Sequence, residues 1–221
     1  MSVKSKIENF LYYYKWIALV VAIFLVFIII SAVQMMSKTE ADAVFLHVGI
    51  TATPSPDVAL INESTGKMMT SDPNGDGKKK ISFVEITVIP DDTNRTLHLD
   101  SAERYRNEVF SGDALIYLLD YEYFSELKDA SLIAPLESAL GSVPEAAFDE
   151  YGILLGKLDA YSLPGFSYLP SDTVICLRVP QTLGISAEES AERHENAKSI
   201  FRDIVSYRAP EDVSAETKTK E

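Results

Sequence analysis

An uncharged run over residues 16–36, WIALVVAIFLVFIIISAVQMM, constrains this chain more than any other feature. A helix rises about 1.5 Å per residue, so a run of this length reaches about 30 Å, the thickness of the hydrocarbon core of a bilayer. Trp16 and the tyrosines at positions 12–14 stand where aromatic rings favour the headgroup layer. The alternative, a buried helix of a soluble protein, would normally carry a polar face. The run therefore predicts a transmembrane helix.

The flanks of this run indicate how the chain is inserted. A cleaved signal peptide has a shorter apolar region and a small-x-small site, and SAVQMMSK offers no convincing site. No cysteine follows the run closely enough to accept a lipid. Lys4, Lys6 and Lys15 precede the run, whereas Lys38 alone follows it closely, and lysine is enriched on the cytoplasmic side. We expect an uncleaved signal anchor in the cell membrane, with the N-terminus in the cytoplasm and the C-terminal domain outside.

The rest of the chain is acidic and long enough for one domain with its own core. The 221 residues carry a net charge of −13, and the first 38 contain four lysines and one glutamate, so the remainder carries −16. This charge argues against nucleic acid as a partner and favours solubility, cations or basic partners. The only cysteine, Cys176, excludes an internal disulfide and falls in an apolar run typical of a core. The predicted organisation is a cytoplasmic tail (1–15), the anchor (16–36), a linker (37–43), an extracytoplasmic domain (44–208) and a disordered tail (209–221).

Within this domain, strand-like and helix-like segments alternate. Strands are predicted at residues 44–50, 81–89, 114–119, 153–161 and 172–179, and helices at 55–66, 100–112, 121–130, 144–151 and 187–208. Asp100 and Glu103 have the spacing of a capping box, and Ser186 with Glu189 repeats it. Asp120 is placed to cap the helix that follows it. We expect an α/β sandwich around a mainly parallel sheet, with residues 114–119 in a central strand and residues 81–89 beside it.

One block, residues 81–92 and 101–140, combines a strand, a helix ending at the turn 111–113, a buried strand, Asp120 before a further helix, and Pro135-Leu136. This succession resembles the first lobe of bacterial extracellular solute-binding proteins, and residues 156–158 and 163–164 faintly resemble the crossing to their second lobe. The resemblance implies a binding role without catalysis. A second lobe is not expected in a chain of this length, so closure of two lobes around a ligand is not expected either.

Residues 72–78, DPNGDGK, resemble the opening of an EF-hand calcium loop. Oxygen donors at the first, third and fifth positions, with glycine sixth, make the side chains of Asp72, Asn74 and Asp76 the candidate ligands, together with the carbonyl of Lys78. Glu85 stands at position fourteen, where the pattern needs position twelve, and three adjacent lysines oppose a cation. The alternative is a tight Asn/Asp/Gly turn that leads into the next strand. The loop therefore predicts either weak calcium binding or a turn with no cofactor.

No cluster of residues specifies a reaction. His47, His98 and His194 are scattered without metal-ligand spacing, and His47 falls in an apolar strand that favours a core position. We expect a non-enzymatic protein whose partners are the lipid bilayer and either a small-molecule ligand or another envelope protein. An accessory subunit of a membrane complex that binds no ligand is the first alternative, and an enzyme of unrecognised type is the second.

Overall fold

The computed structural model describes residues 16–17, 19–31, 41–50, 58–180 and 184–210. The chain forms two compact units, Met1–Glu40 and Ala41–Glu221. In the first unit, residues 16–17 and 19–31 are helical, and the remaining parts of the predicted tail, anchor and linker up to residue 40 lie outside the described residues. No helix within the described ranges is long and apolar enough to span a membrane.

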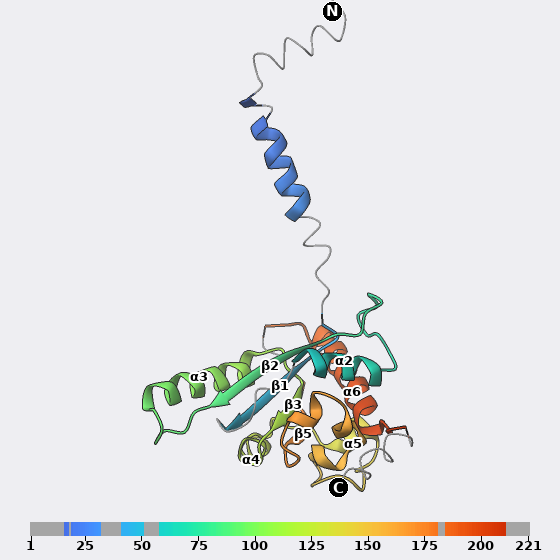
Figure 1. Ribbon diagram of the computed structural model, residues 1–221. Helices are drawn as coiled ribbons and strands as arrows, with labels where there is room; N and C mark the ends of the chain where they lie inside the picture. The colour runs from blue at the N-terminus through green and yellow to red at the C-terminus, as the bar shows by residue number, and fades with distance from the viewer. Residues whose placement is uncertain (1–15, 18, 32–40, 51–57, 181–183, 211–221) are drawn as a thin grey trace, which may run out of the picture. The chain divides into compact units, whose positions relative to one another are not determined.

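The second unit is built on a five-stranded sheet with the order β2-β1-β3-β5-β4 (Figure 1). Its strands are β1 (Ala43–Ile50), β2 (Ile81–Val88), β3 (Ile116–Leu119), β4 (Gly152–Leu154) and β5 (Val174–Leu177). β1 is parallel to β2 and to β3, whereas β5 is antiparallel to β3 and to β4. Four of these five strands therefore point the same way, which confirms an α/β fold with a mostly parallel sheet.

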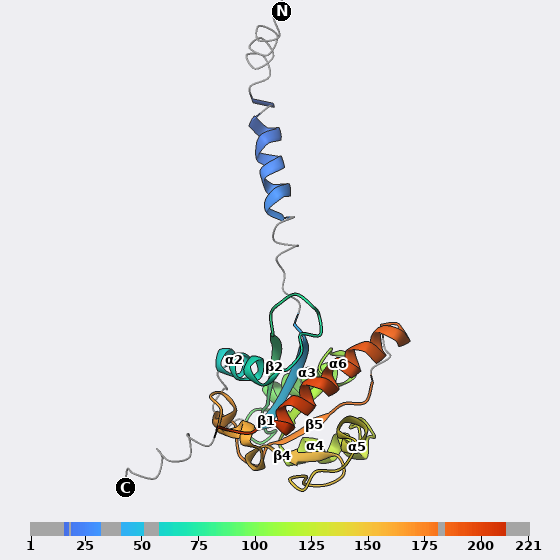
Figure 2. The same ribbon diagram turned by 90° about the vertical axis from the view of Figure 1, so that its right-hand side faces the viewer.

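Helices pack on both faces of the sheet (Figures 1 and 2). One face carries α2 (Val58–Met68), α5 (Leu136–Leu140) and α6 (Ala187–Ser206), and the other carries α3 (Arg95–Ser111) and α4 (Tyr121–Asp129). The side chains of β1 explain why both faces are covered. Phe45 packs in the hydrophobic cluster that includes α6, and its neighbour Leu46 packs in the cluster that includes α3. Successive side chains of a strand point to opposite faces, so a strand that is apolar throughout needs cover on both sides.

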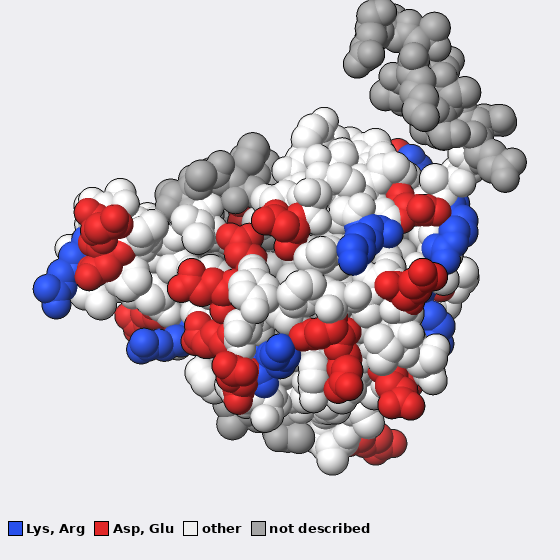
Figure 3. Space-filling model, turned by 90° about the horizontal axis from the view of Figure 1, so that it is seen from below, with Lys and Arg blue, Asp and Glu red and all other residues white. Residues whose placement is uncertain are grey.

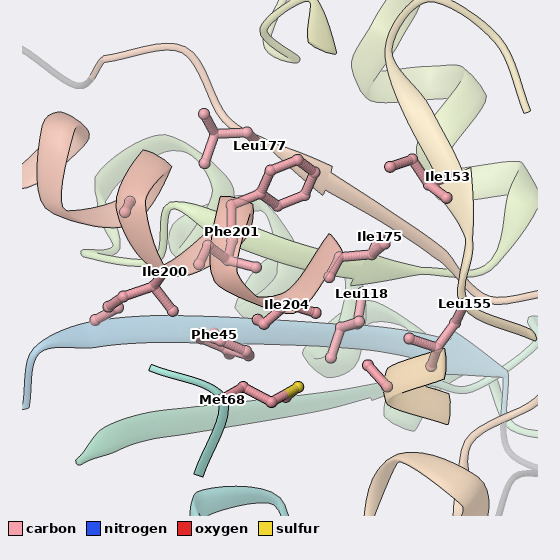
Figure 4. Packing of buried hydrophobic residues seen from close by; sticks show 14 of the residues in the cluster. Phe45, Met68, Leu118, Ile153, Leu155, Ile175, Leu177, Ile200, Phe201 and Ile204 are labelled. Atoms are coloured by element: carbon pink, nitrogen blue, oxygen red, sulfur yellow. The ribbon is translucent and has the colours of Figure 1, made fainter. Parts of the chain in front are cut away.

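The larger hydrophobic cluster lies between the sheet and α6 (Figure 4). Ile200 and Ile204 occupy one face of α6 at helical spacing, with Phe201 beside them, and all three are fully buried. They pack with Phe45 of β1 and Leu118 of β3 in one cluster. Burial of each such side chain contributes about 1.5–3 kcal/mol relative to leaving it exposed, so this contact fixes α6 on the sheet.

The predicted central strand is confirmed, but its predicted neighbour is wrong. Leu115, Tyr117 and Leu119 are buried, and β3 lies third in the sheet order. β2 does not lie beside β3, because β1 lies between them. The burial pattern explains the order: β1 is buried along nearly its whole length, whereas β2 exposes Ser82 and Thr87, as an edge strand can.

Two helix boundaries differ from the prediction. α3 begins at Arg95 instead of near Asp100, because the Asn94 side chain accepts hydrogen bonds from the backbone N–H groups of Thr96 and Leu97. α2 continues through Gly66 to Met68. A Cβ at Gly66 would lie 3.1 Å from the carbonyl oxygen of Lys79, so this glycine permits a close approach of the next loop without ending the helix. The predicted start of α2, at residues 55–57, lies outside the described residues.

The segment between α5 and β5 also differs from the prediction. Residues 144–151 form turns and bends instead of a helix, and the strand expected over residues 153–161 is confined to β4. The 3₁₀ turns η1 (Leu155–Lys157), η2 (Asp159–Ser162) and η3 (Phe166–Tyr168) follow. Leu155 and Leu158 are both buried and stand three residues apart, which is the 3₁₀ repeat. Successive 3₁₀ turns therefore bury apolar residues, such as Leu155 and Leu158, that were predicted to lie in a strand.

Other local predictions are confirmed. Ser186 caps α6, since its hydroxyl oxygen accepts a hydrogen bond from the backbone N–H of Glu189 at 3.1 Å. Cys176 is buried in β5 as a free thiol. Burial raises the pKa of this thiol well above its usual range, so it is not available as a nucleophile.

Candidate functional site

The carboxyl ends of β1 and β3 meet where the strand order reverses. From β1 the chain passes through α2 to β2 on one side of β1, and from β2 it passes through α3 to β3 on the other side. In open α/β sheets, ligands bind outside the carboxyl ends of the strands at such a switch point. A ligand site is therefore expected at this edge of the sheet.

Asp120 occupies this edge and joins the two strand ends. It stands at the N-cap position of α4, but its side chain makes no capping hydrogen bond to that helix. Its Oδ2 instead accepts a hydrogen bond from the backbone N–H of Ile50 at 3.0 Å, and its own N–H donates to the carbonyl of Val48 at 3.0 Å. The cap predicted for Asp120 is thus confirmed in position only, because the carboxylate is turned toward the end of β1.

Gly49 marks a point that a carboxylate and an imidazole both approach. A Cβ at this position would lie 3.4 Å from Oδ2 of Asp120 and 3.4 Å from Cε1 of His47. These are ordinary van der Waals distances, and they show that the Asp120 carboxylate and the His47 ring both lie beside Gly49.

His47 is the buried member of the site. It is 2% exposed, and neither ring nitrogen has a hydrogen-bond partner among the described residues. It stands opposite Glu85 of β2 in the strand register, and its ring stacks on Phe83 with 6.3 Å between centroids. Burial lowers the pKa of His47, and the charges of Glu85 and Asp120 oppose that shift without reversing it. The imidazole is therefore neutral at neutral pH, and its two ring nitrogens lie near the carboxylates of Glu85 and Asp120.

Chemically, these residues, here called the edge cluster (His47, Glu85 and Asp120), are suited to binding. Two half-buried carboxylates accept hydrogen bonds from, and attract, a cationic group. A neutral imidazole supplies one donor and one acceptor. Within the described residues, no group of three or more His, Cys, Asp and Glu side chains is arranged to hold a metal ion.

The predicted calcium ligands lie in the loop before β2, where their oxygens hold the loop's own backbone. Asp72 accepts hydrogen bonds from the N–H groups of Gly75 at 3.0 Å and Gly77 at 2.6 Å. Asn74 Oδ1 accepts from the N–H of Asp76 at 3.0 Å, and Asp76 Oδ1 accepts from the N–H of Lys78 at 2.8 Å. These contacts account for a tight turn by themselves, and calcium binding here remains a prediction.

Two further features define this loop. The buried carboxylate of Asp42 closes its base by accepting from the N–H groups of Asn74 at 3.3 Å and Lys80 at 2.8 Å. Gly75 and Gly77 have φ of 69° and 78°, values that glycine adopts without strain. Glu85 lies four residues into β2, about 13 Å along the strand from its start, so it belongs to the edge cluster and not to this loop.

The remaining histidines serve the fold. A ring nitrogen of His98 lies 2.7 Å from the carbonyl oxygen of Ile89, and one of His194 lies 3.0 Å from that of Arg178. Sequence reasoning placed His47 in the core, Asp120 at a helix cap and Glu85 in doubt as a calcium ligand, and it missed that they form one cluster. The available signal was position, since His47 and Glu85 stand at the middle of two predicted strands and Asp120 directly follows a third.

Comparison with protein-family models, curated proteins and solved structures finds no match to this chain.

Proposed function

We propose that this chain is a single-pass membrane protein whose acidic α/β domain lies outside the cell and binds a ligand without catalysing a reaction. The uncharged run over residues 16–36 and the lysines before it support the anchor and its orientation. The resemblance of residues 81–140 to the first lobe of extracellular solute-binding proteins supports a binding role.

The edge cluster is the observation that carries this proposal. His47 is fully enclosed yet makes no hydrogen bond to a described residue, and an unpartnered buried polar group costs free energy that a ligand can recover. Asp120 adds a negative charge at the switch point, and Glu85 adds a second one opposite His47 on the neighbouring strand β2. Acidic side chains also predominate on the face of the molecule that Figure 3 presents. The ligand class is therefore a small solute with a cationic, hydrogen-bond-donating group.

Thermal unfolding of the full-length chain in a nonionic detergent tests the ligand. Arginine, putrescine and choline are the probes, since specific binding to the folded state raises the melting temperature. Glu85→Gln removes a charge from the edge cluster with little change in shape and should abolish the shift. Glu103→Gln, on the exposed surface of α3, is the matched control and should leave it intact. A melting temperature that none of these solutes raises would reject a cationic ligand.

Protease treatment of intact cells tests the topology. The domain beyond the anchor should be digested while the cells remain closed, and the chain should sediment with the membrane fraction through high-salt washing. Protection of the domain until the cells are lysed would reverse the proposed orientation.

A second candidate function, an accessory subunit that binds a membrane complex and no ligand, is favoured by α3. This helix buries only Tyr105 and Val109 among its described residues, and it exposes Leu97, Leu99 and Phe110 at 47%, 58% and 60%. Exposed apolar patches mark protein contacts, and Leu99 and Phe110 lie about three turns apart on the same side of this helix. Loss of co-purifying membrane proteins in Phe110→Ser, with unchanged melting temperature, would favour this candidate.

A further inference from the structure

A groove of about 720 Å³ lies on the second unit, outside the edge cluster. Its walls come from the end of α5 and the loop after it, from η1 and η2, and from the C-terminal half of α6. Ligand pockets of proteins span about 300–1,000 Å³, so this groove is large enough for a small molecule.

Three cations line the groove: Lys157, Arg202 and Arg208. None of them forms an ion pair within 4.0 Å with a described residue. Lys128 and Arg193 each lie within 3.0 Å of a carboxylate, but Arg106 on α3 also forms no ion pair with a described residue. The groove is therefore distinguished by three cations that line it together. In a domain this acidic, three cations without an ion-pair partner in one groove favour an anionic occupant.

The two guanidinium groups are held in place by backbone carbonyls. Arg202 donates from Nη2 to the carbonyl of Ala139 at 2.8 Å, and Arg208 donates from Nη1 to the carbonyl of Tyr207 at 2.9 Å. A guanidinium has five N–H donors in a fixed fork, so each group keeps donors for a ligand after making these bonds. Fixing a guanidinium in advance lowers the entropy that binding would otherwise cost.

Other charges around the groove oppose an anion and have to be weighed. The end of α6 carries carbonyl groups at the negative end of the helix dipole, but Arg208 donates to two of them, those of Val205 and Tyr207. Glu145 and Asp159 also line the groove, and Asp159 already accepts from the backbone N–H of Ala209 at 3.3 Å. The three cations still exceed the two carboxylates, so the lining is locally basic.

Most of the remaining lining is apolar, although Ser142 and Ser206 also contribute to it. Side chains of Leu140, Pro144, Ala146, Leu158 and Val205 contribute to the lining. A fully hydrated inorganic ion would gain nothing from such a wall, whereas an apolar substituent would be removed from water by it.

We propose that this groove binds a small molecule carrying an oxyanion, either a carboxylate or a phosphate, on an apolar body. Lys157, Arg202 and Arg208 hold the oxyanion, and the apolar wall holds the body. This site does not depend on the edge cluster, which selects the opposite charge.

Isothermal titration of the full-length chain in a nonionic detergent tests the proposal. Butyrate and butyl phosphate, which carry the same apolar body, are the probes, at an ionic strength held constant with sodium chloride, because screening alone weakens exposed charges. Lys157→Gln and Arg208→Gln should each raise Kd about tenfold, the loss expected for one charge-assisted hydrogen bond. The Lys157 side chain is exposed and makes no hydrogen bond or ion pair to a described residue. Lys157→Gln should therefore fold, and it still tests the groove if Arg208→Gln does not fold.

Arg106→Gln is the matched control, since Arg106 is exposed on α3 and does not line the groove. Saturable binding that survives in Arg106→Gln and Glu85→Gln, but weakens in Lys157→Gln, supports the site. Tighter binding of butyrate than of butyl phosphate assigns a carboxylic acid, and the reverse assigns a phosphate ester. Absence of saturable binding for both anions, or equal weakening in Arg106→Gln, overturns the proposal.

Discussion

The carboxylate of Asp120 accepts a hydrogen bond from the backbone N–H of Ile50 at 3.0 Å, which ties the start of α4 to the last residue of β1. The contact joins residues 70 positions apart, across the point where the strand order reverses. It also leaves the carboxylate beside Gly49 and His47. The Asp120 side chain therefore both links α4 to the end of β1 and forms part of the candidate site.

Replacement of Asp120 by Ala should destabilise the domain by about 1–3 kcal/mol, because hydrogen bonds to charged groups contribute in this range. Urea unfolding followed by circular dichroism measures the loss. Asp113→Ala is the control, since the ion pair of Asp113 with Arg193 is exposed and such pairs contribute about 0.2–1 kcal/mol. Equal losses in the two variants would show that the Ile50 contact contributes no more than a surface pair.

Truncation of Leu118 to Ala should cost about 2–5 kcal/mol, the range for a buried leucine whose loss leaves a cavity. Leu118 is fully buried in β3, at the centre of the sheet. Leu99→Ala, at a leucine that is 58% exposed on α3, should cost less than about 0.5 kcal/mol. If chemical denaturation gives the two variants the same midpoint, the packing described for β3 is wrong.

Stability should fall as the pH falls below 6.5, the ordinary pKa of histidine. Burial lowers the pKa of His47 and of His194 in the folded state, so the unfolded chain takes up protons first and gains from them. The stability that the two neutral histidines contribute is fully present above the pKa of histidine in the unfolded chain. It is lost as the pH falls toward their lower pKa in the folded chain. Unfolding free energies on both sides of pH 6.5 should show a smaller slope in His47→Gln than in the wild type. An unchanged slope would mean that His47 is not buried in the neutral form.

Calcium should raise the melting temperature of the full-length chain if Asp72, Asn74 and Asp76 converge on an ion. The lysines beside them should keep the affinity low, on the order of 10⁻⁴–10⁻³ M, as in extracellular calcium modules. Asp76→Ala should abolish the shift, whereas Asp91→Ala, at an exposed acid outside the loop, should retain it. Melting curves that coincide in chelator and in excess calcium would leave the loop as a turn only.

The sequence by itself determined the features that depend on neighbouring residues. Continuous apolar runs located β1, β3 and β5, since strands buried on both faces need apolar side chains throughout, and alternating β-branched residues located β2. The Ser186 cap was predictable because it joins groups three residues apart, at Ser186 and Glu189. The α/β class followed from the alternation of such local signals.

Tertiary structure decided whatever depends on contacts between distant segments. The spacing of residues in the sequence cannot show that β1 lies between β2 and β3. The order of the strands depends on which strand the helices cover on both faces, and that strand lies between the other two. The residues after Leu154 leave the sheet because the apolar cluster under α6 can be filled by turns as well as by a strand. His47, Glu85 and Asp120 come from three separate segments, and only the parallel pairing of their strands brings them to one edge.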